Sequence, residues 1–112
     1  MVKPISRPYS QYSLNVLNLF GQLIREARLK KALTTTELAE RAGISRTLLQ
    51  RIERGDPGCS IGAVFEVAAI CGVPLFESDE REMANLPATQ KEKMALLPKR
   101  VRSGHKITKD DF

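Results

Sequence analysis

The chain has 112 residues, of which 42% are hydrophobic, and this suits one globular domain with extended ends. No apolar run approaches the ~20 residues that cross a bilayer, so we expect no membrane span. The formal net charge of +5 favours a polyanionic partner. The two cysteines, Cys59 and Cys71, lack metal-ligand spacing, so we expect a cytoplasmic protein with reduced thiols and without a metal or a cofactor.

An irregular arm comes first in the chain. Residues 1–12 contain Pro4 and Pro8 and show no hydrophobic period, which predicts a flexible arm. The arm is either free in solution or in contact with a polyanionic partner. Lys3 and Arg7 are not followed by an apolar segment, so we do not expect a signal peptide.

The next element is a long helix, which Ser10 or Ser13 can cap and which we extend to about Lys31. Its core stripe has helical spacing and consists of Leu17, Phe20, Ile24 and Ala27. Further leucines beside this stripe indicate packing on the C-terminal part of the protein or on a second chain: Leu14, Leu19 and Leu23. Gly21 costs about 1 kcal/mol in a helix relative to alanine, so we expect another helix close to it.

Two short helices joined by a tight turn follow. Thr34 and Glu37 have the spacing of a capping box, which begins the first of them. Gly43 can end that helix in the left-handed conformation, and Ser45 caps the next one, which stops at Gly55. Aliphatic residues form the inward set: Leu38, Ala39, Ala42, Ile44, Leu49 and Ile52. Polar residues form the outward face: Arg46, Thr47, Gln50 and Arg51. This pattern predicts a helix-turn-helix whose outward face suits a DNA major groove.

A fourth helix is predicted from Ile61 to Cys71, after a turn at Asp56 and a cap at Ser60. Gly72 and Pro74 should end it. Five of its residues are expected in the core: Ile61, Val64, Phe65, Ala68 and Ala69. A fifth short helix or a turn then begins with Val73, Leu75 and Phe76, and we expect the phenylalanine in the core.

The C-terminal part changes in composition. Residues 77–82 are acidic and should lie away from any DNA-binding face. A short helix is expected over residues 79–85, and Pro87 should break it before another helix over residues 88–97. Residues 98–112 lack core periodicity, which predicts a basic tail that is either solvated or folds on a partner.

The helix-turn-helix stretch resembles the XRE/Cro family of phage-repressor-like proteins. The resemblance rests on Leu38-Ala39, on Ala42-Gly43-Ile44-Ser45 and on Ile52-Glu53-Arg54-Gly55. It covers about half of the chain and implies a compact, all-α, five-helix DNA-binding domain. Carried over residue by residue, it implies base contacts by Arg46, Thr47, Gln50 and Arg51, and phosphate contacts by Thr35 and Ser45. Members commonly have glutamine where this chain has Thr35, and threonine reaches less far.

The family also implies a structural ion pair between Arg28 and Glu53. Physically, a partly buried carboxylate needs a partner, and a planar guanidinium can bind it with two hydrogen bonds. The pair would fix the angle between the first helix and the helix after Ser45, which carries the expected base contacts.

The tail is similar to the tails of HipB-like antitoxins in the sequence of residues 96–102 and in the last three residues. This similarity implies a kinase-like toxin as partner. The tail residues expected to bind it are Lys99, Arg100, Arg102 and Phe112.

The sequence therefore predicts a non-enzymatic transcriptional regulator with four segments. These are a flexible arm (1–12), a helix-turn-helix domain (13–78), a helical extension (79–97) and a basic flexible tail (98–112). The expected partners are double-stranded DNA and a second copy of the chain, in a repressor that binds a palindromic operator. The alternative is an antitoxin that binds a kinase-like toxin and represses its own operon. Neither paired carboxylates nor a Ser/His/Asp set indicates an enzyme.

Overall fold

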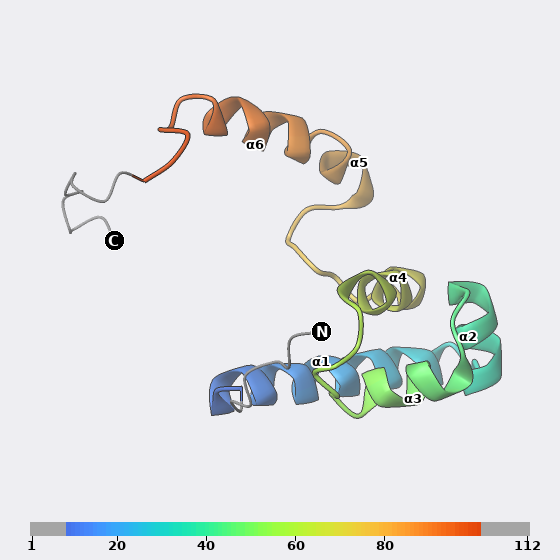
Figure 1. The fold of residues 1–112 in the computed structure, drawn as a ribbon. Helices are drawn as coiled ribbons and strands as arrows, with labels where there is room; N and C mark the ends of the chain where they lie inside the picture. Colours follow the sequence, from blue (N-terminus) through green and yellow to red (C-terminus); the bar gives the residue numbers. More distant parts are fainter. Residues whose placement is uncertain (1–8, 102–112) are drawn as a thin grey trace. The chain divides into compact units, whose positions relative to one another are not determined.

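The computed structural model describes residues 9–101, and every regular element among them is an α-helix. The helices are α1 (Gln11–Lys30), α2 (Thr35–Ala42), α3 (Arg46–Glu53), α4 (Ile61–Cys71), α5 (Glu80–Met83) and α6 (Leu86–Met94) (Figure 1). The predicted all-α class is confirmed. The chain divides into two compact units after Leu75: the first holds α1 to α4 and the second holds α5 and α6.

Side-chain caps explain where the first four helices begin. The Oγ atom of Ser10, rather than that of Ser13, accepts a hydrogen bond from the backbone ahead of it, so α1 begins at Gln11. This start lies inside the segment expected to be an arm. Thr34 and Glu37 form both bonds of the predicted capping box at α2. The predicted serine caps of α3 and α4 are also present.

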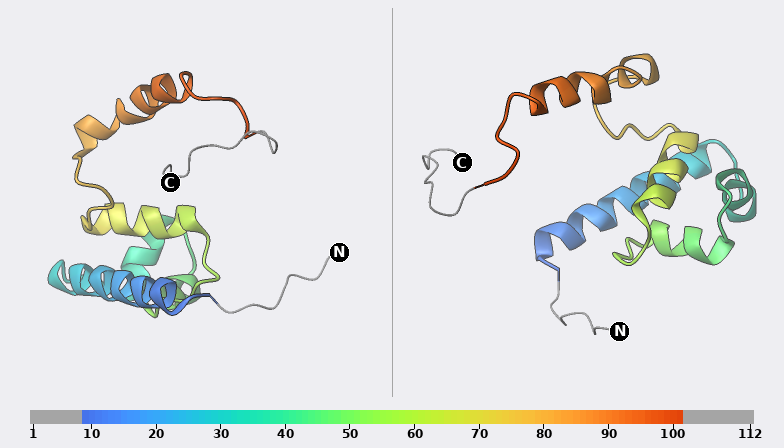
Figure 2. Two further views of the ribbon diagram at one scale, coloured as in Figure 1. Left: turned by 90° about the vertical axis from the view of Figure 1, so that its left-hand side faces the viewer. Right: turned by 45° about the horizontal axis from the view of Figure 1, so that its top comes forward.

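The core of the first unit takes one fully buried side chain from each of its four helices: Ile24, Leu38, Leu49 and Val67. The inward stripe predicted for α1 and the inward set predicted for α2 and α3 are buried or half-buried. Because these residues come from all four helices, the core fixes α3 relative to α1, α2 and α4 (Figures 1 and 2).

The core face of α4 agrees with the prediction at Ala68, which is buried, and at Val64, which is half-buried, but differs at three other positions. Ile61 is 68% exposed and Phe65 is 41% exposed, and Ala69 is also exposed. The buried positions include Val67 and Cys71 instead. Nearly all residues of α4 are apolar, so periodicity alone does not decide which face turns inward. Phe76, also expected in the core, is exposed.

Gly21 lets α1 and α3 approach closely, as the sequence predicted. A Cβ atom added at this glycine would lie 2.6 Å from the backbone oxygen atoms of both Ile52 and Glu53. Gly55 makes a second close approach: an added Cβ would lie 2.9 Å from the Cα atom of Asn18. Gly55 also has a φ of +80°, which favours glycine. The C-terminal end of α3 therefore lies directly against α1.

The chain after α4 forms bends and not a fifth helix of the first unit. Val73 is buried, but Pro74 cannot donate a backbone hydrogen bond and restricts its neighbour to extended conformations. The fifth helix, α5, lies in the second unit and begins with a capping box between Asp79 and Glu82. The chain breaks between α5 and α6, as predicted, but Pro87 itself lies just after the break. It lies in the first turn of α6, where a backbone N–H has no helical partner.

Candidate nucleic-acid interface

Helices α2 and α3 are joined by a three-residue turn (Figure 1). Gly43 has a φ of +70° in this turn, and the backbone N–H of Ile44 donates to the carbonyl oxygen of Ala39 over 3.0 Å. Ile44 itself is half-buried against the core. The turn thus has the left-handed residue and the inward aliphatic residue of a helix-turn-helix.

The outer face of α3 is polar. Arg46 and Thr47, in its first turn, are exposed, and Gln50 is half-buried one turn later. Leu49 and Ile52 are buried on the opposite side. The structure therefore places these three predicted base-contacting residues on one accessible face of a helix whose other face is anchored in the core.

Arg51, the fourth of these residues, is held by the loop after α3. Its Nε atom lies 2.8 Å from Oδ2 of Asp56, and its side chain is 37% exposed. The other oxygen of Asp56 accepts the backbone N–H of Gly58 at 2.8 Å. The bonds from Arg51 and then from Gly58 hold the pKa of Asp56 below its ordinary value. The ion pair uses Nε, so the two terminal nitrogens of Arg51 can donate elsewhere.

Sequence reasoning did not find Asp56 as the partner of Arg51, because it assigned this residue to a turn only. The usable signal was the Asp-Pro-Gly sequence five residues after the arginine. An aspartate in such a turn binds a backbone N–H two residues ahead, and its second oxygen then remains for a nearby arginine.

The two residues predicted to contact phosphates lie at helix N-termini. Thr35 is the first residue of α2 and is half-buried. Ser45 caps α3 and is exposed; its Oγ atom accepts the backbone N–H of Leu48 at 3.0 Å, so its O–H group remains free to donate. Helix N-termini attract phosphate groups through their free N–H groups and their positive end of the helix dipole.

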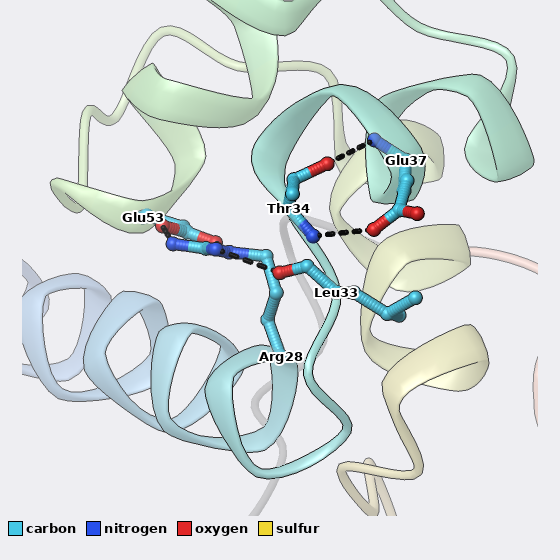
Figure 3. A network of polar contacts seen from close by, with 5 residues as sticks. All are labelled: Arg28, Leu33, Thr34, Glu37 and Glu53. Atoms are coloured by element: carbon cyan, nitrogen blue, oxygen red, sulfur yellow. Dashed lines mark hydrogen bonds and ion pairs between the residues drawn. The ribbon is translucent and has the colours of Figure 1, made fainter.

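A buried ion pair fixes α3 to α1 (Figure 3). Arg28 is 7% exposed and donates from Nε to Oε2 of Glu53 at 2.7 Å and from Nη2 to Oε1 at 3.1 Å. Its Nη1 atom also donates to the carbonyl oxygen of Leu33 at 3.0 Å, a contact that the sequence did not reveal. The hydrogen bond with Glu53 raises the pKa of Arg28, while burial opposes this shift. One guanidinium therefore joins α1, the α1–α2 linker and the end of α3.

Two of the four residues of the predicted partner-binding tail lie among the described residues. Lys99 and Arg100 are exposed and belong to the second unit. Arg102 and Phe112 lie outside the described residues.

Residues 9–101 contain neither a metal-binding cluster nor a membrane-spanning helix. No group of His, Cys, Asp and Glu side chains in this part could hold a metal ion. None of its helices has the length and apolar character needed to cross a bilayer. Cys59 is half-buried and Cys71 is buried; burial raises the pKa of both thiols.

Comparison with known proteins agrees with this geometry. Residues 19–82 match the family described as "Helix-turn-helix domain". Over 57 residues the chain is 42% identical to a Pyrococcus furiosus protein named "Putative HTH-type transcriptional regulatory protein". This alignment covers 51% of the chain but 18% of the relative, so the chain spans less than a fifth of that protein's length. The family match extends over more than half of the chain and includes α2, the turn and α3, and the chain therefore belongs to the helix-turn-helix domain family.

Proposed function

We propose that this protein is a sequence-specific regulator of transcription of the XRE/Cro, phage-repressor-like type. It binds double-stranded DNA as a homodimer on a palindromic operator and represses by occluding the promoter. The observation that carries this proposal is the anchoring of α3: its inner face is in the core, its end is held by Arg28, and its polar face is exposed.

The side chains on α3 suit base recognition in the major groove. Arginine can donate two hydrogen bonds to O6 and N7 of guanine, which suits Arg46 and the terminal nitrogens of Arg51. Gln50 can pair with N6 and N7 of adenine, and the methyl group of Thr47 can contact that of thymine. Thr35 and Ser45 hold DNA phosphates, and these contacts set the register of α3 on the duplex.

A homodimer follows from the small size of this face. One helix of eight residues reads only a few base pairs, whereas two copies related by a two-fold axis read two half-sites about one DNA turn apart. The net charge of +5 per chain adds a sequence-independent attraction to phosphates.

Selection of bound sequences from random DNA, repeated at several salt concentrations, tests the proposal. We expect a palindromic consensus, and we expect Arg46→Ala to cost about 1–3 kcal/mol of discrimination at one position in each half-site. Arg51→Ala should relax a second position. Arg81→Ala, in α5, is the matched control and should keep the consensus. An unchanged consensus and affinity in both α3 variants would remove these residues from base recognition.

One observation favours the antitoxin as a second candidate function. Helices α5 and α6 bury no residue, and Leu96, Leu97 and Val101 after them are all exposed. A kinase-like toxin could cover these residues. Co-purification with the product of an adjacent kinase-like gene tests this candidate: Leu97→Lys should abolish the complex and leave DNA binding intact. An intact complex in this variant would place the toxin contact elsewhere.

A further inference from the structure

We propose that α1 forms the homodimer interface, through an exposed apolar face that consists of Tyr12, Val16, Leu19 and Leu23. We call this face the α1 seam. A second copy of the chain packs its own α1 seam against it. This inference rests on the proposed function, which requires a dimer, and adds the surface by which the dimer forms.

The spacing of the α1 seam is that of a helix–helix interface. Its four residues follow one another at intervals of four, three and four, the heptad pattern of helices that pack along their length. Tyr12 is 78% exposed and Leu19 is 57% exposed. The first turns of α1 also project beyond the other helices of the first unit (Figures 1 and 2). The occupant that fits such a seam is therefore another helix.

The absence of charge around the α1 seam favours a second copy as that occupant. No residue from Gln11 to Ile24 carries a charge, so the exposed face of α1 is neutral over about four consecutive turns. A two-fold axis brings each patch against its own copy, and like charges near that axis would repel one another. The flanking side chains of Asn15 and Gln22 are amides, which can donate to and accept from identical groups.

Other described surfaces fit this role less well. The exposed side of α4 offers two large apolar residues, Ile61 and Phe65, and includes the charged Glu66, which a two-fold axis would bring near its copy. Helix α6 has charged residues at three successive positions, and its large apolar residues, Leu86 and Met94, lie at its opposite ends. Neither helix has an uncharged seam of comparable length.

A dimer through the α1 seam leaves α3 free for DNA. Gly21 faces the end of α3, and Leu19 and Leu23 are each two residues from it, about 200° around the helix. The α1 seam therefore lies on the flank of α1 away from α3, and the helices of the dimer follow the order α3–α1–α1–α3. The axes of neighbouring packed helices are about 8–10 Å apart, and this order contains three such distances, so the two α3 helices are separated by about 24–30 Å. This approaches the ~34 Å between half-sites one DNA turn apart.

Sedimentation equilibrium of the full chain tests the interface. The wild-type protein should form a species of twice the 12.5 kDa chain mass. Leu19→Lys should weaken this dimer more than about 30-fold, because each copy buries a charge at the centre of the seam. Lysine adds no negative charge that could repel DNA. Leu29→Lys is the matched control: Leu29 is on the same helix, is 55% exposed and lies off the seam, so this variant should remain a dimer.

Four results would overturn the proposal. These are a monomeric wild type, a dimeric Leu19→Lys variant, a monomeric Leu29→Lys variant, and loss of the dimer in Ile61→Lys, which would move the interface to α4. A monomeric wild type that Leu19→Lys destabilises would show that the chain covers the seam itself. Circular dichroism must show native helix content in each variant. If Leu19→Lys is unfolded, Val16→Lys takes its place in the test.

DNA binding separates this inference from the proposed function. Leu19→Lys should still bind a single half-site but lose the cooperative occupation of the palindrome. Arg46→Ala should lose discrimination at one position of each half-site and remain a dimer. A seam dimer that binds no DNA would contradict the proposed function alone, whereas specific DNA binding by a dimer that tolerates Leu19→Lys would contradict the interface alone.

Discussion

The two units of the chain begin their helices with the same local signals, but among residues 9–101 the buried core belongs to the first unit alone. Thr34 and Glu37 at α2, and Asp79 and Glu82 at α5, form equivalent capping boxes with bonds of 2.8 to 3.0 Å. Helix α2 buries two residues in the core, whereas α5 buries none. Capping therefore decides where a helix begins, and burial decides whether the helix is fixed in a tertiary structure.

The strongest test of this difference removes the buried ion pair of the first unit. Arg28→Ala leaves the carboxylate of Glu53 nearly buried and unpaired, since its side chain is 8% exposed, and should cost about 3–5 kcal/mol. Arg25→Ala, an exposed arginine on the same helix, should change stability by less than about 0.5 kcal/mol. Urea denaturation followed by circular dichroism measures both. Wild-type stability in Arg28→Ala would show that the pair does not hold α3.

Glycine substitution tests the close contact between α1 and α3. Gly21→Ala improves helix propensity, but its methyl group would meet two carbonyl oxygen atoms, so we expect a net loss of about 1–3 kcal/mol. Gly62→Ala is the control, because no atom lies within 4 Å of the added Cβ in α4, and it should stabilise by about 0.5–1 kcal/mol. Thermal melting compares the two. Stabilisation by both would show that the backbones of α1 and α3 do not meet closely at Gly21.

The capping boxes allow a direct comparison of the two units. Thr34→Ala should lower the free energy of unfolding of the first unit by about 1 kcal/mol, because its cap supports a packed helix. Asp79→Ala removes the same bonds from α5 and should reduce helix content without shifting that transition. Hydrogen exchange, resolved by residue, reports both effects. A shift of the main transition by Asp79→Ala would show that the two units unfold together.

The smallest expected effect is the pH dependence of the α2 cap. The backbone N–H of Thr34 binds Glu37 and lowers the pKa of this carboxyl group from its ordinary value of 4.5. A group with a lowered pKa in the folded state contributes stability above its unfolded pKa. This contribution is lost as the pH falls through the lower, folded value. The stability difference between wild type and Glu37→Gln should therefore be present at pH 6 and diminish below about pH 4. A difference that is the same at both pH values would contradict this assignment.

The sequence predicted most of what depends on neighbouring residues. The caps at Thr34, Ser45 and Ser60 are present, and the α1 stripe around Ile24 faces inward, because capping bonds and helical periodicity act within a few residues. The partners Arg28 and Glu53 were named by family resemblance, and the structure brings them together. The outward position of Arg46 follows from the same periodicity.

The sequence did not decide features that depend on distant segments. The apolar α4 helix could bury either Phe65 or Val67, and the positions of α1 and α2 select Val67. Likewise, Arg51 and Asp56 are only five residues apart in the sequence, but their pairing depends on how the loop after α3 folds back toward that helix. The predicted break between two helices near Pro87 is present, but the second helix begins at Leu86, ahead of the proline, because proline also suits a first turn.

By itself, the sequence determined the helix-turn-helix and the identity of the side chains on its outer face. Both follow from short-range spacing of polar, aliphatic and capping residues. Only the tertiary structure decided which side of α4 is covered, how the loop holds Arg51, and that the uncharged seam of α1 stays exposed. These features depend on the packing of whole helices against one another, because burial is a property of a side chain's neighbours in space and not of its place in the chain.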